Sequence, residues 1–136
     1  MSDKESLIEN IVELTNKGNF SLQKFDFDEK NFGNFCIALT CNKQVNIRFI
    51  RDRGTVWCEA GRDGEWYLIE DVFRLIGTEF ISEKSETIEF LSYMSGILMK
   101  NISKVMDVFD ANNIADTHVK IKKIATERAL EMFKTE

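Results

Sequence analysis

Hydrophobic and polar residues alternate with a period of two through the middle of the chain. The apolar members of this pattern are Val45, Ile47, Phe49, Val56, Cys58 and Ala60. Such alternation is typical of strands that place one face on a core. The polar and glycine residues between the two runs therefore predict an antiparallel hairpin over residues 45–60.

Two registers are open to this hairpin. A three-residue loop at 52–54 pairs Arg51 with Thr55. A shift by one residue instead pairs the apolar positions with one another and places Arg48 opposite Glu59, a contact of about 0.2–1 kcal/mol. Because the wrong register exposes a whole apolar face, we predict the second register, with a loop of two or four residues.

In the second register the other face of the hairpin carries two large apolar side chains beside an ion pair. Its members are Arg48, Ile50, Trp57 and Glu59. This face either packs under a helix as a thinner second layer, which we favour, or binds a partner, because exposed Trp and Arg are enriched at interaction hot spots. The candidate partner-binding residues are Trp57, Arg48, Glu59, Arg53, Trp66 and Tyr67.

The N-terminal segment has a helical pattern. Its apolar stripe, closed by Gly18, predicts a helix over about residues 4–17. Ser6 and Glu9 have the spacing of a capping box near its start. The stripe consists of Leu7, Ile8, Ile11, Val12 and Leu14.

Two strands are expected between this helix and the hairpin. Residues 20–27 alternate with a change of phase at Lys24, which indicates a bulge, and residues 35–40 alternate without one. The end of the first strand carries an acidic cluster of Asp26, Asp28 and Glu29. Such carboxylates could bind a cation or serve acid–base chemistry, but a solvated loop is the favoured interpretation because no partner group lies nearby.

The second half of the chain is predicted to be mainly helical. A turn at 61–64 leads through a short extended segment into a helix that ends at Gly77. Apolar residues spaced three and four apart then indicate one helix of about 25 residues after residue 82, roughly 38–40 Å long, with a kink or close contact at Gly96. Its seam consists of Ile88, Leu91, Ser95, Leu98, Ile102, Val105 and Phe109. A final helix over about 116–134 would pair with it.

These elements predict a single α+β domain over residues 1–136. It comprises an N-terminal helix, an antiparallel sheet of about four strands, a short helix and a C-terminal antiparallel pair of long helices. A chain of 136 residues with 43% hydrophobic content is large enough to bury a proper core.

Composition narrows the classes of partner. A net charge of −5 and a pI near 5.0 speak against general nucleic-acid binding, which needs a basic face. The N-terminus lacks the apolar segment of a signal peptide, and no run approaches the roughly 18 apolar residues of a membrane span. An odd count of three cysteines fits reduced thiols. We therefore expect a cytoplasmic protein with no membrane or nucleic-acid partner.

The residues that could carry chemistry are sparse and separated. His118, the only histidine, has just Asp116 and Thr117 beside it and is interpreted as a surface residue near a helix start. The cysteines lie in strand patterns and are interpreted as buried small side chains. Neither zinc-ligand spacing nor a phosphate-binding glycine motif occurs. We expect no catalytic residues, no cofactor and no metal site, and an enzyme is disfavoured.

Four arginines near the hairpin could grip a carboxylate or phosphate. They are Arg48, Arg51, Arg53 and Arg62. Asp52, Glu59 and Asp63 are interleaved with them, so internal ion pairing is the favoured interpretation.

The hairpin also resembles a group of known proteins. The run Ile47-Arg48-Phe49-Ile50-Arg51-Asp52-Arg53-Gly54, followed by Val56-Trp57-Cys58-Glu59 and then by Trp66 before a helix, is similar to small bacterial proteins associated with polymorphic toxin systems. Many of these are known only as immunity proteins or are uncharacterised. The similarity spans about a third of the chain, from Phe32 to Gly77. It implies a cytoplasmic α+β protein that binds and neutralises a cognate toxin, and it brings no catalytic residues.

Residue pattern and resemblance together predict a non-catalytic module that binds a protein partner, as an immunity-like inhibitor of a bacterial toxin. One alternative is a small-molecule-binding regulatory domain, with a pocket between sheet and helices. Another is a homodimeric scaffold joined through the C-terminal helices.

Overall fold

Five antiparallel strands form one sheet in the order β1-β2-β3-β4-β5, so that sequence neighbours pair throughout. The computed structural model describes residues 2–28, 30, 33–42, 44–81 and 88–134. The strands are β1 (Ser21–Asp28), β2 (Asn34–Cys41), β3 (Val45–Asp52), β4 (Thr55–Arg62) and β5 (Glu65–Leu68). The expected α+β architecture is confirmed. The sheet has one strand more than predicted, because the extended segment after the 61–64 turn pairs with β4 as β5.

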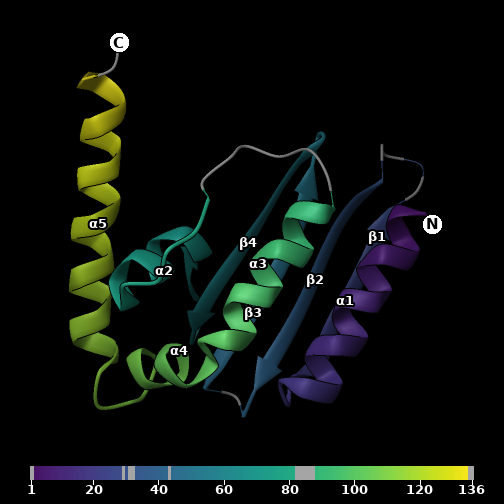
Figure 1. Ribbon diagram of the computed structural model, residues 1–136, viewed down its shortest axis with the longest axis horizontal. Coiled ribbons are helices and arrows are strands. Elements are labelled where there is room, and N and C mark those ends of the chain that lie inside the picture. The colour runs from purple at the N-terminus through teal and green to yellow at the C-terminus, as the bar shows by residue number, and fades with distance from the viewer. Residues whose placement is uncertain (1, 29, 31–32, 43, 82–87, 135–136) are drawn as a thin grey trace.

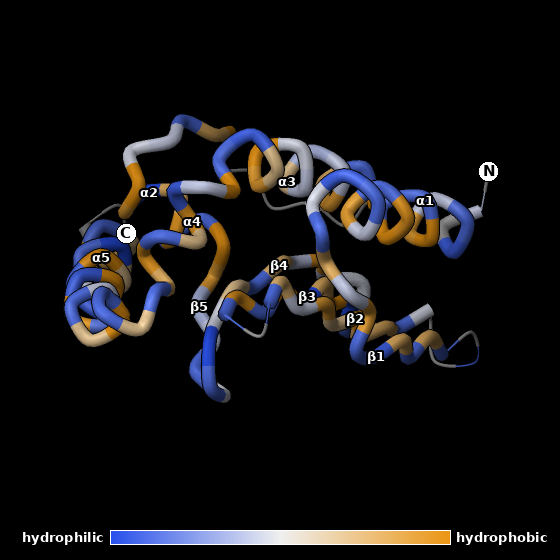
Figure 2. Tube along the Cα trace, turned by 90° about the horizontal axis from the view of Figure 1, so that it is seen from below, coloured by the Kyte–Doolittle hydropathy of each residue, from blue (hydrophilic) through white to orange (hydrophobic). Residues whose placement is uncertain are grey.

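The helices lie over one face of this sheet and beyond its β5 edge. They are α1 (Asp3–Lys17), α2 (Ile69–Ile76), α3 (Glu89–Lys100), α4 (Ile102–Val108) and α5 (Ile114–Lys134). Figure 1 shows α1 and α3 lying over the sheet roughly along the direction of its strands, with α5 next to α2. Seen from below in Figure 2, the helices occupy one side of the strands, and the other side carries none of the described elements.

The predicted register of the central hairpin is confirmed. Phe49 lies opposite Cys58 and Arg48 lies opposite Glu59. The strands are joined by a two-residue loop in which Arg53 has φ 52° and Gly54 has φ 84°. Two left-handed residues in a row define the turn whose twist matches that of paired strands. The apolar pattern therefore decided the register, and the turn adapted to it.

The covered face of the sheet forms the core. From the sheet it receives Phe35, Ile37, Leu39, Val45, Ile47, Phe49, Val56, Cys58 and Ala60, all buried. From the helices it receives Leu7, Ile11, Leu14, Leu91, Met94 and Leu98, also buried. The bulge expected near Lys24 is present as a register shift between Leu22 and Lys24.

The first helix differs from its prediction in two details. Its N-cap is Ser2, whose hydroxyl accepts a hydrogen bond from the Glu5 backbone N–H at 3.2 Å. The capping box therefore does not begin at Ser6. Ile8 and Val12, expected in the buried stripe, are 41% and 48% exposed, because only one side of the helix rests on the sheet.

The prediction of a single long helix after residue 82 is wrong, because the structure has two helices there, α3 and α4. The chain breaks between α3 and α4 at Asn101, which has φ −117°. The Asn101 side chain donates to the Ile97 carbonyl at 2.9 Å and accepts from the Thr78 hydroxyl at 3.1 Å. An amide that bonds its own backbone competes with the helix, so the break falls there and not at Gly96. Residues 82–87 of the prediction lie outside the described residues.

The last helix packs chiefly against α2, so the expected hairpin of two long helices does not form. The Asp71 carboxylate, only 3% exposed, joins them. Arg128 of α5 donates to both Asp71 oxygens, at 3.1 and 2.9 Å, and Arg74 donates to Oδ1 at 3.0 Å. A buried carboxylate needs such partners. The ion pair between Asp71 and Arg128 therefore holds α5 against α2.

Two glycines make a matched stability test. A Cβ on Gly61 would lie 1.8 Å from the Glu65 carbonyl oxygen, whereas one on Gly96 meets nothing within 4 Å. We expect Gly61→Ala to lower the free energy of unfolding by about 1–3 kcal/mol, because backbone must move. Gly96→Ala, in a helix, should raise it by about 0.5–1 kcal/mol. Urea unfolding measures the free energy of unfolding of both variants. Equal changes in the two variants would contradict the close approach of Gly61 to the Glu65 backbone at the β4–β5 turn.

Glu70 predicts a pH dependence. Burial, and then the neighbouring Asp71 charge, raise the pKa of its carboxyl above the ordinary 4.5, and Oε1 has no hydrogen-bond partner among the described residues. The stability that protonated Glu70 contributes is complete below about pH 4.5 and is lost as the pH rises through the folded-state pKa. Glu70→Gln should therefore gain stability relative to the wild type as the pH rises from 4 to 7. Urea unfolding across this range measures the difference in the free energy of unfolding between variant and wild type.

Glu127→Gln, on the exposed side of α5, is the control, and its difference from the wild type should not change with pH. A difference for Glu70→Gln that does not change with pH would contradict the raised pKa of Glu70.

Candidate functional site

The sheet face opposite the helices, called here the open face, is ordered into cross-strand rows by the register. The first row, one residue from each of β1 to β4, is Asp26, Cys36, Ile50 and Trp57. The second row is Lys24, Ala38, Arg48, Glu59 and Leu68. The third row is Thr40, Asn46, Gly61 and Trp66. Most of these side chains are half-buried or exposed.

The favoured interpretation of this face as a second layer under a helix is wrong. Figure 2 shows the described helices on the opposite side of the sheet. Trp57 and Ile50 are accordingly half-buried, whereas Phe49 and Cys58, their neighbours on the covered face, are almost completely buried. The two apolar side chains lie on an outer surface of the described structure.

Arg48 is held in place by two contacts on the open face. Its Nε donates to Oε1 of Glu59, the residue opposite it. Its guanidinium lies over the ring of Trp66, 4.1 Å from the centroid. An arginine over an indole is the favourable geometry of a cation–π contact. The internal ion pairing expected for the arginine cluster is therefore confirmed at Arg48.

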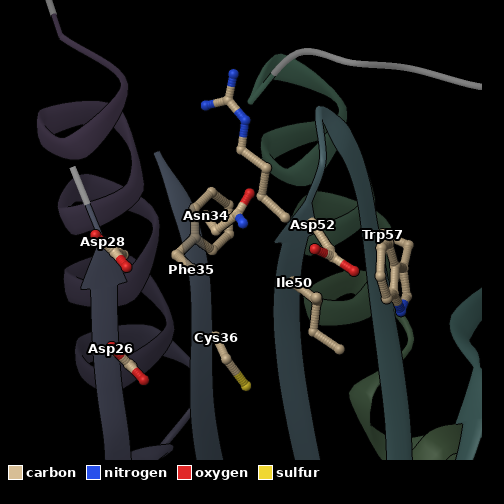
Figure 3. Close-up of a pocket in the computed structure, with 9 residues that line it drawn as sticks. Asp26, Asp28, Asn34, Phe35, Cys36, Ile50, Asp52 and Trp57 are labelled. Atoms are coloured by element: carbon tan, nitrogen blue, oxygen red, sulfur yellow. The ribbon is translucent and has the colours of Figure 1, made fainter. Parts of the chain in front are cut away.

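A shallow hollow of about 370 Å³ opens on this face. It is lined by Asp26, Asp28, Asn34, Phe35, Cys36, Ile50, Arg51, Asp52 and Trp57. In Figure 3 the side chains of Ile50, Cys36 and Trp57 project on the side facing away from the helices, and the carboxylate of Asp52 lies next to Trp57. Acidic groups around an aromatic and aliphatic floor suit an organic cation, such as a lysine or arginine side chain.

The structure places the six predicted site residues in three regions. Arg48, Glu59, Trp57 and Trp66 share the open face. Arg53 lies in the exposed β3–β4 turn, where its backbone N–H donates to the Asn34 side chain at 3.0 Å. Tyr67 lies opposite Ala60 and therefore faces the helices. It therefore lies on the opposite side of the sheet from the four residues of the open face.

Tyr67 instead contacts the only histidine. Its hydroxyl oxygen lies 2.6 Å from Nδ1 of His118 on α5, and burial, followed by the charge of Glu65, raises the pKa of the phenol. His118 lies near the start of α5, as predicted, but it is half-buried and not fully exposed. The pair joins β5 to the start of α5 across 51 positions of sequence, which local patterns could not reveal.

Several residues of the hollow were not predicted as site residues. Asp26 and Asp28 belong to β1 and not to a loop, although Asp26 is exposed to solvent as expected. Glu29 lies outside the described residues. Cys36 faces Ile50 across the β2–β3 ladder. The alternation of both strands was visible in the sequence, and extending the hairpin register to β2 would have placed Cys36 beside Ile50.

The three cysteines differ in environment. Cys58 is buried, and burial followed by the charges of Glu70 and Glu59 raises the pKa of its thiol. Burial likewise raises the pKa of Cys41. Cys36 is half-buried on the open face. The structure thus confirms burial for Cys41 and Cys58, whereas Cys36 faces outward.

Among the described residues, no group of three or more His, Cys, Asp or Glu side chains is arranged to hold a metal ion. None of the helices in the part of the chain that the structure describes is long and apolar enough to cross a membrane. Comparison of the chain with protein-family models, curated proteins and solved structures found no match.

The position of Trp57 predicts a small effect of its removal on folding. Trp57→Ala should lower the free energy of unfolding by about 1 kcal/mol or less, the scale of one cross-strand pair. Phe49→Ala, on the covered face of the adjacent strand, should cost about 3–5 kcal/mol. Chemical unfolding of both variants measures the contrast. A loss for Trp57→Ala as large as that for Phe49→Ala would show that Trp57 is part of the core.

Proposed function

We propose that the chain is a non-catalytic protein-binding module that inhibits a cognate bacterial toxin by covering a basic surface of the toxin with the open face. The observation that carries this proposal is the hollow on the uncovered side of the sheet, where Trp57 and Ile50 lie among three aspartates. A central aromatic side chain with polar groups around it is typical of interface hot spots. The resemblance of the hairpin to proteins of toxin systems supports the same class of partner.

The charge of the hollow favours a basic partner. Three carboxylates, those of Asp26, Asp28 and Asp52, line it together with one guanidinium, that of Arg51, and the whole chain has a net charge of −5. Complementary charge raises the rate of association and disfavours acidic partners. A lysine or arginine of the toxin would bring its cation against the Trp57 ring, with an aspartate oxygen within reach.

The surface beside the hollow is ordered before a partner binds. Arg48 is fixed between Glu59 and the ring of Trp66. Immobilising a long side chain on binding costs about 0.5–1.5 kcal/mol. An arginine that is already held avoids most of this cost. The stacked Arg48 and Trp66 therefore extend the contact area toward β5 with little further loss of entropy.

Protection against a toxin tests the proposal. The genes next to the gene of this chain are searched for a toxin domain, and the absence of one would count against the proposal. A toxin domain found there is expressed in a bacterial host, and growth is followed with and without the chain. The wild type should restore growth and bind the purified domain. Trp57→Ala and Asp52→Lys should each weaken binding by at least about tenfold, because truncating or reversing a hot-spot residue costs about 2 kcal/mol or more.

Asp107→Lys is the matched control for the charge reversal. Asp107 is an exposed residue of α4, a helix that lies on the side of the sheet opposite the open face (Figure 2). The Asp107→Lys substitution changes the net charge by the same amount as Asp52→Lys, and it should leave the protection and the affinity for the toxin unchanged. The proposal is wrong if the wild type gives no protection, or if Trp57→Ala and Asp52→Lys bind as tightly as the control.

A further inference from the structure

Exposed large apolar side chains gather at the free edge of β1. Ile8 and Val12 of α1 are 41% and 48% exposed, and Leu22 and Phe25 of β1 are 47% and 39% exposed. Single exposed apolar residues are ordinary, but a contiguous group marks a contact surface. This group, called here the β1-edge patch, is separate from the open face, because Phe25 lies opposite the core residue Ile37.

The backbone beside this patch is an unpaired strand edge. Among the strands that the structure describes, β1 is the outermost one and pairs with β2 alone. It is eight residues long, and six of its residues are exposed. An edge of this length presents unpaired N–H and C=O groups to another strand. The bulge between Leu22 and Lys24 confines the regular part of that edge to residues 24–28.

The orientation of α1 brings its exposed side chains over the same edge. At 100° per residue, Leu7, Ile11 and Leu14 share the side that faces the sheet. Asn10 points toward α3, where its Nδ2 donates to the Ser92 hydroxyl at 3.0 Å. Ile8 and Val12 fall on the side opposite Asn10. In Figure 2, α1 lies between α3 and the outer end of the sheet, so that side faces outward above β1.

We propose that the β1-edge patch binds a second copy of the chain, with the two β1 strands antiparallel about a two-fold axis at Phe25. In this arrangement Lys24 lies opposite Asp26 of the second copy, and the reverse pair forms by symmetry. Lys24 and Asp26 are exposed, and neither side chain takes part in an ion pair with another described residue. Opposite charges directly across two strands stabilise them by about 0.2–1 kcal/mol per pair.

Charge selects this register over its neighbours. A two-fold axis between antiparallel strands pairs residues that share a face, so the axis passes through a residue. An axis at Lys24 sets two lysines against each other, and an axis at Asp26 sets two carboxylates against each other. The axis at Phe25 avoids both and stacks the two Phe25 rings on the side of α1. There the Ile8 and Val12 side chains of the two α1 helices also approach.

The dimer would join two five-stranded sheets into one. Because the axis is perpendicular to the sheet, both sets of helices lie on one side and both open faces lie on the other. The open face of each copy therefore stays accessible, and the dimer is independent of the proposed function. A bivalent partner would be bound more tightly by two faces than by one.

Sedimentation equilibrium of the full chain tests the dimer through a charge exchange. Lys24→Glu and Asp26→Lys should each weaken dimerisation by about tenfold or more, because like charges then face each other twice. The double variant Lys24→Glu/Asp26→Lys restores opposite charges and should recover the wild-type constant. An axis at Asp26 would give no recovery, since two lysines would meet there. Both substituted residues are exposed on the surface of the monomer. Circular dichroism checks that each variant is folded.

Two controls complete the experiment. Lys122→Glu and Asp107→Lys make the same charge changes at other exposed positions and should leave the dimer intact. Leu130→Asp/Phe133→Asp removes the exposed apolar residues at the end of α5, 56% and 75% exposed, where the sequence suggested a homodimer. It should have no effect. A wild type that is monomeric at every concentration, a double variant without recovery, or dissociation by the α5 variant would each overturn the proposal.

Discussion

The pairing register of β3 and β4 is the constraint on which the rest of the structure depends. It puts Ile47 and Phe49 on the same face as Cys58 and Ala60, and a slip of one residue would turn that whole face toward solvent. Because every strand pairs with its sequence neighbours, the register of this hairpin is passed on to β2 and β5. It thereby decides which side chains the helices cover.

The same constraint leaves one face without helices. Each helix has a single apolar side, and α1 and α3 direct theirs to the core. The last helix is held against α2 by Asp71 and Arg128, beyond the β5 edge (Figure 2). The part of the chain described here thus directs its helices to one side. Trp57, Ile50 and the Arg48–Glu59 pair lie on the other, where they can contact a second protein.

Local signals in the sequence were sufficient for much of this fold. The hairpin register, the β1 bulge, the end of α2 at Gly77 and the buried seam of α3 and α4 all follow from periodicity and turn residues. Contacts between distant segments could not be predicted in this way. Asp71 and Arg128 are 57 positions apart, and the break at Asn101 depends on a hydrogen bond from Thr78. The candidate site was found in part, since the pattern identified Trp57 but could not tell whether a helix covers it.

Thiol reactivity tests the central claim, that the face bearing Trp57 is open to solvent, without any knowledge of the partner. Cys36 lies on the open face, while Cys41 and Cys58 are buried on the covered one. The native protein is treated with iodoacetamide, and the modified residues are mapped by mass spectrometry over time. The account predicts that Cys36 reacts first and that Cys41 and Cys58 react only on unfolding. Protection of Cys36 equal to that of Cys58 would contradict it.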